Sequence, residues 1–196
     1  MEVDKIEKLT NYRWLNLFKI LFTRNGKQGE WLFASRSQNP EKTKSIAIPD
    51  AVIVVPIHIN KEGKRSLVIT KEYRFPIGSY EYGFPAGLLD PNEGVEESAK
   101  RELFEETGLT LTKTLKVSPA LFSSAGLTDE TAQYLICECE GEPTKMHLQD
   151  SEDIETILMD KVAVINLLNS TELKMSAKMW AIIYGFICGL QNDILG

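Results

Sequence analysis

Three glutamates near the middle of the chain have the spacing of a metal-binding patch. Glu102, Glu105 and Glu106 lie three and four residues apart, and residues at these spacings are neighbours on the surface of a helix. Their oxygens are hard ligands of the kind that Mg2+ and Mn2+ prefer, and such ions commonly complete their shells with water and substrate phosphates. The alternative is a solvated acidic helix face without a ligand.

The neighbouring residues predict the helix that must position these glutamates. Apolar residues recur at Val95, Ala99 and Leu103, the spacing of one buried helical face, and Gly108 stands where a C-cap glycine would. We therefore expect a helix over 95–107. Its last turn carries the negative end of the helix dipole, so carboxylates gathered there repel one another unless a cation is present.

A basic residue in the same stretch can offset part of this charge. Arg101 directly precedes the first glutamate, and Glu93 lies just before the predicted helix. A guanidinium and a carboxylate so placed can form a bidentate pair.

The complete spacing of this stretch resembles the signature box of the Nudix hydrolases. Nine specified positions in 23 match without a gap. They are Gly87, Glu93, Arg101, Glu102, Leu103, Glu105, Glu106, Gly108 and Leu109. The resemblance implies a loop–helix–loop that binds divalent cations and cleaves a diphosphate joining a nucleoside to another group.

The same resemblance assigns roles residue by residue. Metal binding falls to Glu102, Glu105 and Glu106, with the carbonyl of Ala86 as a further ligand, and Glu105 is also a candidate catalytic group. Arg101 and Glu93 hold the loop. Gly87 and Leu88 are candidates for substrate binding.

Two downstream loops resemble loops of ADP-ribose and GDP-sugar hydrolases. The connection 122–130 is similar to a Ser-Pro-Gly-x-(Ser/Thr)-x-Glu loop, with Ala125 in place of proline, and Glu130 is then a candidate substrate or metal contact or an ordinary solvated glutamate. The segment 147–155 holds four carboxylates within six residues. By resemblance, Asp150 or Glu152 is the general base; the alternative is that metal-bound water loses its proton without help.

Two positions upstream of the box bear on the substrate. Arg74 follows a predicted strand over 66–73, where relatives often have an arginine that reaches phosphate; a surface arginine is the alternative. Gly83 stands where many relatives have a glutamate. Glu81 lies on the same face as residue 83 only if no bulge intervenes in that strand.

Composition excludes several classes of function. With 43% hydrophobic and 26% charged residues, the chain is an ordinary globular one, and a net charge of −6 argues against nucleic-acid binding. The first residues do not read as a signal peptide, and the apolar segment 179–190 is too short to span a membrane. Three cysteines without a zinc-ligand pattern, Cys137, Cys139 and Cys188, fit reduced thiols. We expect a cytoplasmic protein.

The chain divides on pattern into two parts. Residues 1–44 contain two strands, 14–22 and 30–35, joined by a turn at Asn25-Gly26, which we read as a dimerisation hairpin or, alternatively, as extra edge strands. Residues 45–196 form the Nudix domain by resemblance, an α/β/α sandwich with a mixed sheet. The expected further strands are 51–59, 66–73, 114–121, 131–138 and 156–159, and the expected further helices are 160–168 and 175–191.

These observations together predict an enzyme. The expected reaction is Mg2+-dependent (or Mn2+-dependent) hydrolysis of ADP-ribose to AMP and ribose 5-phosphate by a homodimer, with the substrate implied by resemblance. The alternatives are a nucleotide-sugar pyrophosphatase acting on GDP-mannose or a UDP-sugar, and a nucleotide-sensing module that has lost catalysis.

Overall fold

The computed structural model describes residues 2–189, with side chains described as far as Ile187. The chain forms two compact units. One comprises the residues up to 51 together with 119–133, and the other comprises 52–118 and the chain from 134 onward. The domain boundary predicted after residue 44 remains a prediction.

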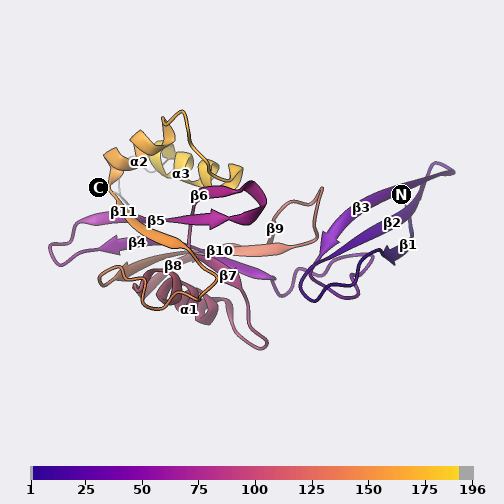
Figure 1. Ribbon diagram of the computed structural model, residues 1–196, viewed down its shortest axis with the longest axis horizontal. Helices are drawn as coiled ribbons and strands as arrows, with labels where there is room; N and C mark the ends of the chain where they lie inside the picture. Colours follow the sequence, from indigo (N-terminus) through magenta and orange to yellow (C-terminus); the bar gives the residue numbers. More distant parts are fainter. Residues whose placement is uncertain (1, 190–196) are drawn as a thin grey trace. The chain divides into compact units, whose positions relative to one another are not determined.

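The first unit holds an antiparallel sheet in the order β1-β2-β3 (Figure 1). Its strands are β1 (Glu2–Lys8), β2 (Asn16–Arg24) and β3 (Lys27–Ser35). The predicted hairpin is confirmed as β2 and β3, whose turn has φ of 51° at Asn25 and 74° at Gly26, as a two-residue hairpin turn requires. β1 was not predicted, because its mostly charged sequence gives no clear alternation of apolar and polar residues.

The second unit is built on a mixed sheet with the strand order β11-β5-β4-β10-β8. Two short strands extend it, since β6 pairs with β5 and β7 pairs with β4. The bounds are β4 (Ala51–Ile59), β5 (Arg65–Arg74), β6 (Ser79–Gly83), β7 (Ala86–Leu88), β8 (Thr110–Val117), β10 (Thr131–Glu140) and β11 (Ile154–Met159). In the first unit, β9 (Leu121–Phe122) pairs with the first two residues of β10.

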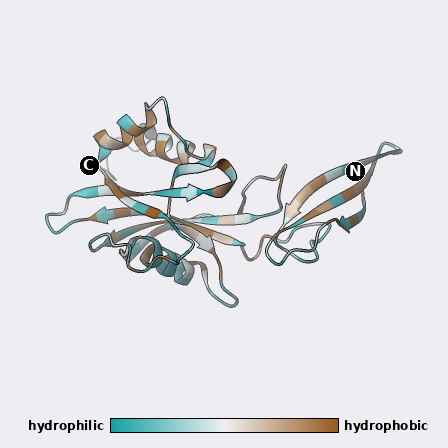
Figure 2. Ribbon diagram, in the orientation of Figure 1, coloured by the Kyte–Doolittle hydropathy of each residue, from teal (hydrophilic) through white to brown (hydrophobic). Residues whose placement is uncertain are grey.

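Helices cover both faces of this sheet, which confirms the expected sandwich (Figure 1). α1 (Val95–Thr107) lies on one face, and α2 (Lys161–Leu168) and α3 (Ala177–Gly189) lie on the other. Hydrophobic residues concentrate in the central strands and on α3, whereas α1 is largely hydrophilic (Figure 2). α1 therefore keeps only a narrow apolar stripe for packing and leaves the rest of its surface for charged groups.

Each face of the sheet has its own core. Under α1, Leu103 packs with Val54 and Val68. Under α2 and α3, Ile69 packs with Ile183 and neighbouring residues. Because side chains alternate along a strand, β5 sends Val68 to the α1 face and Ile69 to the opposite face.

Most of the predicted elements are present, with shifted ends. The helix predicted over 95–107 is α1, ended by Gly108 at φ 75°, and the strand predicted over 51–59 is β4. The strand predicted over 114–121 is displaced, because β8 ends at Val117. The helix predicted over 175–191 is α3; its predicted last residues, 190 and 191, and the side chain of Cys188 lie outside the described residues. Among the helices that residues 2–189 form, none combines the length and apolar character that crossing a bilayer demands.

Candidate active site

The strand β7 and the helix α1 form the core of the site. Gly87, in β7, lies directly against the Glu102 carboxylate: a Cβ at residue 87 would stand 1.8 Å from Glu102 Oε1. The backbone N–H of Ala86 donates to Glu106 Oε1 at 3.4 Å. The glycine that opens the box is thus required because any side chain there would occupy the space of a carboxylate.

The guanidinium of Arg101, on α1, contacts several carboxylates of the box. Its Nε and Nη2 donate to the two oxygens of Glu93 at 2.9 and 2.8 Å, which is the predicted bidentate pair. Its Nη1 lies 2.7 Å from Glu102 Oε1 and 3.4 Å from Glu105 Oε2. Nη2 also donates to the carbonyl of Leu88 at 3.1 Å. One guanidinium therefore holds the loop and two of the three box glutamates.

Burial opposes the ionisation of the two buried carboxylates of α1. Burial raises the pKa of Glu106 well above its usual value, and the negative charges of Glu102 and Glu72 raise it further. Burial likewise raises the pKa of Glu102, although Arg101 opposes that shift. A cation placed between the two carboxylates would stabilise their charged forms.

A further carboxylate, which the sequence analysis did not predict, belongs to this cluster. Glu72 lies on β5, two and four residues beyond Thr70 and Val68 and on the same face toward α1. Burial raises its pKa, and the charges of Glu152 and Glu81 add to that effect. The signal was available, since a glutamate on the α1-facing side of a strand that is otherwise buried needs a reason.

The acidic cluster extends to Glu81 on β6, and Arg74, a predicted substrate contact, forms ion pairs with its carboxylates. The pairing of β5 with β6 runs without a shift from Thr70–Gly83 to Arg74–Ser79, so Glu81 and Gly83 share a face. Arg74 Nη1 lies 2.7 Å from Glu72 Oε1, and its Nε lies 3.7 Å from Glu81 Oε2. The guanidinium of Arg74 thus belongs to the rim of the cluster, and its contact with substrate stays a prediction.

The loop before β11 carries both candidate bases, and their surroundings differ. The negative charge of Glu152 raises the pKa of Glu72, Glu102 and Glu106, so this carboxylate lies near enough to act on the cluster. Its Oε2 accepts from the backbone N–H of Gln149 at 2.9 Å. Asp150 is exposed.

This acidic loop is fixed at both ends to the second unit. At its start, the N–H of Thr144 donates to the carbonyl of Thr107 at 2.9 Å. The ring of His147 lies 4.3 Å from that of Phe104, centroid to centroid. At its end, Ile154 pairs with Glu72 as β11 joins β5. The loop that carries Glu152 therefore connects the end of α1 to the strand beside Glu72.

Glu130 belongs to the first unit. Its Oε2 accepts from Arg36 Nε at 2.7 Å, and the neighbouring Asp129 accepts from the Ser35 hydroxyl at 2.9 Å. Both contacts tie the connection between β9 and β10 to the end of β3. A role for Glu130 toward substrate or metal stays a prediction.

The donor chemistry of the second unit fits a divalent cation. Within residues 2–189, no group of three or more Asp, Glu, His or Cys side chains is arranged to hold a metal ion without further ligands. Glu102 and Glu106 nevertheless present buried, mutually repelling carboxylates beside a backbone kept free of side chains by Gly87. An open donor set of this kind suits Mg2+, which usually retains several waters and binds through one or two carboxylates and the phosphates of its substrate.

An acidic helix set against a glycine-containing strand in an α/β/α sandwich agrees with the Nudix fold that the signature box implies. The comparisons agree: a model of the NUDIX domain matches residues 48–179. ADP-ribose pyrophosphatase of Saccharomyces cerevisiae is 30% identical over 162 residues, covering 79% of this chain and 68% of that protein. ADP-sugar pyrophosphatase of Mus musculus is 26% identical over 196 residues, covering 97% and 87%.

A solved structure shows the same fold. The crystal structure of an ADP compounds hydrolase superposes with a TM-score of 0.68 at 20% identity, covering 93% of this chain and 89% of that one. The chain belongs to the Nudix hydrolase family, in its ADP-ribose pyrophosphatase-like group, and is a Nudix pyrophosphohydrolase.

Proposed function

We propose that this enzyme hydrolyses the diphosphate of ADP-ribose to AMP and ribose 5-phosphate in the presence of Mg2+. The observation that carries the proposal is the pair of buried carboxylates beside β7, with Glu102 against Gly87 and Glu106 at the N–H of Ala86. Burying two like charges together is unfavourable unless a cation accompanies them. An acidic protein also needs such a cation to admit a diphosphate.

In this proposal, different side chains of the second unit bind the metal ion and orient its ligands. Glu102 and Glu106 would hold Mg2+, with Glu105 and the carbonyl of Ala86 beside them. When bound, Mg2+ supplies neutralisation of the diphosphate charge and a lowered pKa for the attacking water. Arg101 keeps Glu102 and Glu105 oriented through the contacts described above.

Glu152 is the proposed general base. Its charge acts on Glu72, Glu102 and Glu106, which supports a position within reach of a water at the cluster. It would take one proton from that water as the oxygen attacks phosphorus. Arg74 on the rim is the proposed contact for a substrate phosphate.

The relatives support an adenosine diphosphate substrate. Their names refer to ADP-ribose, ADP-sugar and ADP compounds. An ADP-sugar is therefore the second candidate, ahead of GDP-mannose or a UDP-sugar.

Replacing Glu106 tests the enzyme reading. Glu106→Gln keeps the shape of the side chain and removes a charge that burial disfavours, so the fold should be as stable as the wild type or more so. Release of AMP from ADP-ribose with Mg2+ should fall by about a hundredfold or more. Glu62→Gln, an exposed change in the turn after β4, is the matched control. Wild-type turnover in Glu106→Gln would refute the proposal.

The first unit supports a homodimer. Its side chains Tyr12, Trp14 and Trp31 are 71%, 66% and 54% exposed, and apolar area of this kind beside the open edges of a small sheet favours pairing with a second copy. Sedimentation equilibrium of the wild type and of Trp14→Ser tests this, with a dimer expected for the first and a weakened one for the second. A wild-type monomer would refute it.

Two buried thiols support a cytoplasmic location. Cys137 and Cys139 are free and buried in β10, and unpaired thiols are usual where the surroundings are reducing.

A further inference from the structure

The residue that follows the proposed base is held by two neighbouring strands of the second unit. The carbonyl of Asp153 accepts from the backbone N–H of Tyr73 on β5 at 3.1 Å. The carboxylate of Asp153 accepts from the hydroxyl of Tyr80 on β6. Tyr73 and Tyr80 lie opposite each other in the pairing of β5 with β6. One cross-strand pair therefore fixes Asp153 through both its backbone and its side chain.

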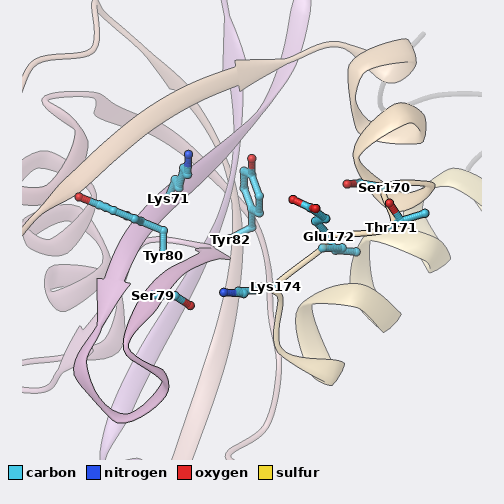
Figure 3. A pocket seen from close by; sticks show the side chains of 9 residues that line it. Lys71, Ser79, Tyr80, Tyr82, Ser170, Thr171, Glu172 and Lys174 are labelled. Carbon is cyan, nitrogen blue, oxygen red and sulfur yellow. The ribbon is translucent and has the colours of Figure 1, made fainter.

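Neighbouring side chains hold the ring of Tyr80 in place. Its centroid lies 5.4 Å from that of the Tyr73 ring, edge to face, and 5.5 Å from Lys71 Nζ. Both kinds of contact attract beyond simple burial. Tyr80 also lines a pocket of about 750 Å3 together with Lys71, Lys174 and their neighbours, and its hydroxyl points away from Lys174 (Figure 3). The hydroxyl is thus directed out of this pocket, to its bond with Asp153.

This bond lies on the face of the sheet opposite to the acidic cluster. Glu72, which faces α1, pairs with Ile154 of β11 and with Glu81 of β6. Side chains alternate along an extended chain, so Asp153 and Tyr80, each one residue away from a partner of Glu72, point to the other face. The bond can therefore influence chemistry at the cluster only through the loop that carries the base.

A turn ties Glu152 to the residue that is held in this way. The backbone N–H of Glu152 donates to the carbonyl of Gln149 at 2.9 Å, and Glu152 Oε2 accepts from the backbone N–H of Gln149 at 2.9 Å. The turn ends one residue before Asp153. Because consecutive Cα atoms are only about 3.8 Å apart, a displacement of Asp153 carries Glu152 with it.

We infer that Tyr80 positions the general base, because its bond to Asp153 holds the turn that keeps Glu152 at the acidic cluster. The inference rests on the proposed role of Glu152 in hydrolysis. Tyr80 acts through Glu152 and not on the reacting atoms, so it is a positioning residue. Its loss should therefore slow the chemical step and leave substrate binding nearly unchanged.

Removing the hydroxyl with and without the base tests the inference. Tyr80→Phe keeps the ring and its contacts, and with ADP-ribose and Mg2+ it should lower kcat about tenfold while KM changes less than about twofold. In the Glu152→Gln background the same change should cost less than about twofold, because residues that act as a unit are not additive. Equal losses in the two backgrounds, or no loss in either, would overturn the inference.

Two substitutions of Asp153 separate the hydrogen bond from the charge. Asp153→Asn keeps an oxygen acceptor and should retain kcat within about threefold, whereas Asp153→Ala should lose about as much as Tyr80→Phe. Combining Asp153→Ala with Tyr80→Phe should cost no more than either alone. Tyr184→Phe removes a hydroxyl from another exposed tyrosine, on α3, and as the control should leave kcat unchanged. Equal losses in Asp153→Asn and Asp153→Ala would contradict a role for the bond.

Hydrogen exchange gives a readout that does not depend on substrate. The amides of Gln149 and Glu152 are both bonded within the turn, so Tyr80→Phe should speed their exchange at least about threefold, and Tyr184→Phe should not. Unchanged exchange in Tyr80→Phe would overturn the inference. A wild type that leaves ADP-ribose intact would instead refute the proposed function, and faster exchange in Tyr80→Phe would still show that Tyr80 holds the turn.

Discussion

The carboxylate of Glu102 occupies the space in which any residue other than glycine at position 87 would carry its Cβ. This contact joins β7 to the helix that holds the acidic cluster. It also explains in physical terms why the box begins with glycine.

Gly87→Ala should therefore inactivate the enzyme while leaving it folded. The added methyl group forces the Glu102 carboxylate away, and a displacement of about 1 Å at a catalytic group can cost about a hundredfold in rate. Gly185→Ala on α3, where a Cβ would meet nothing within 4 Å, is the control and should be neutral or slightly stabilising. AMP release and circular dichroism check both, and full activity in Gly87→Ala would contradict the geometry.

Glu152→Gln and Asp150→Asn should differ sharply in rate. If Glu152 removes the proton, kcat should fall by about 100- to 10,000-fold in Glu152→Gln, whereas it should fall only a few fold in Asp150→Asn, because Asp150 is exposed. Steady-state kinetics at saturating Mg2+ decide the matter. The reverse order of effects would transfer the role to Asp150, and two small effects would indicate that no side-chain base is needed.

The Glu93–Arg101 pair should make stability depend on pH in the acid range. Hydrogen bonds from Arg101 lower the pKa of Glu93 from 4.5 to about 2. Because the folded pKa lies below the unfolded one, the pair stabilises the fold fully above about pH 4.5, and this contribution is lost as the pH falls toward 2.

Urea unfolding of Glu93→Gln measures this contribution. The variant should be less stable than the wild type by about 1–2 kcal/mol at pH 7, allowing for partial exposure of the pair, and the difference should shrink as the pH is lowered from 4.5. A difference that stayed constant down to pH 3 would show that Glu93 acts through something other than its charge.

Mg2+ should stabilise the wild type against heat. A ligand that binds only the folded state raises the melting temperature with its concentration, and the relief of repulsion between Glu102 and Glu106 is the source here. Glu102→Gln with Glu106→Gln should melt at the same temperature with or without Mg2+. A wild type indifferent to Mg2+ would remove the support for a metal at this cluster.

The sequence predicted the parts of the site that are continuous along the chain. The box helix, its glycine cap and the Glu93–Arg101 pair follow from local spacing, and local spacing also predicts the hairpin turn at Asn25. Glu72 was not predicted to belong to the site. Its place in the cluster depends on which face of β5 meets α1, and tertiary packing decides that. The pocket lined by Lys71 and Lys174 could not be predicted for the same reason, because these two residues are far apart in the sequence.

The anchoring of the 144–154 segment has a consequence for motion in the enzyme. One end is bonded to the carbonyl of Thr107, the last residue of α1, and the other begins the strand beside Glu72. A tilt of α1 that shifts Glu102 and Glu106 should therefore shift the start of the 144–154 segment, which carries Glu152, in the same direction. We therefore expect Glu152, Glu102 and Glu106 to move together, so that the distances between these three carboxylates change little when α1 moves.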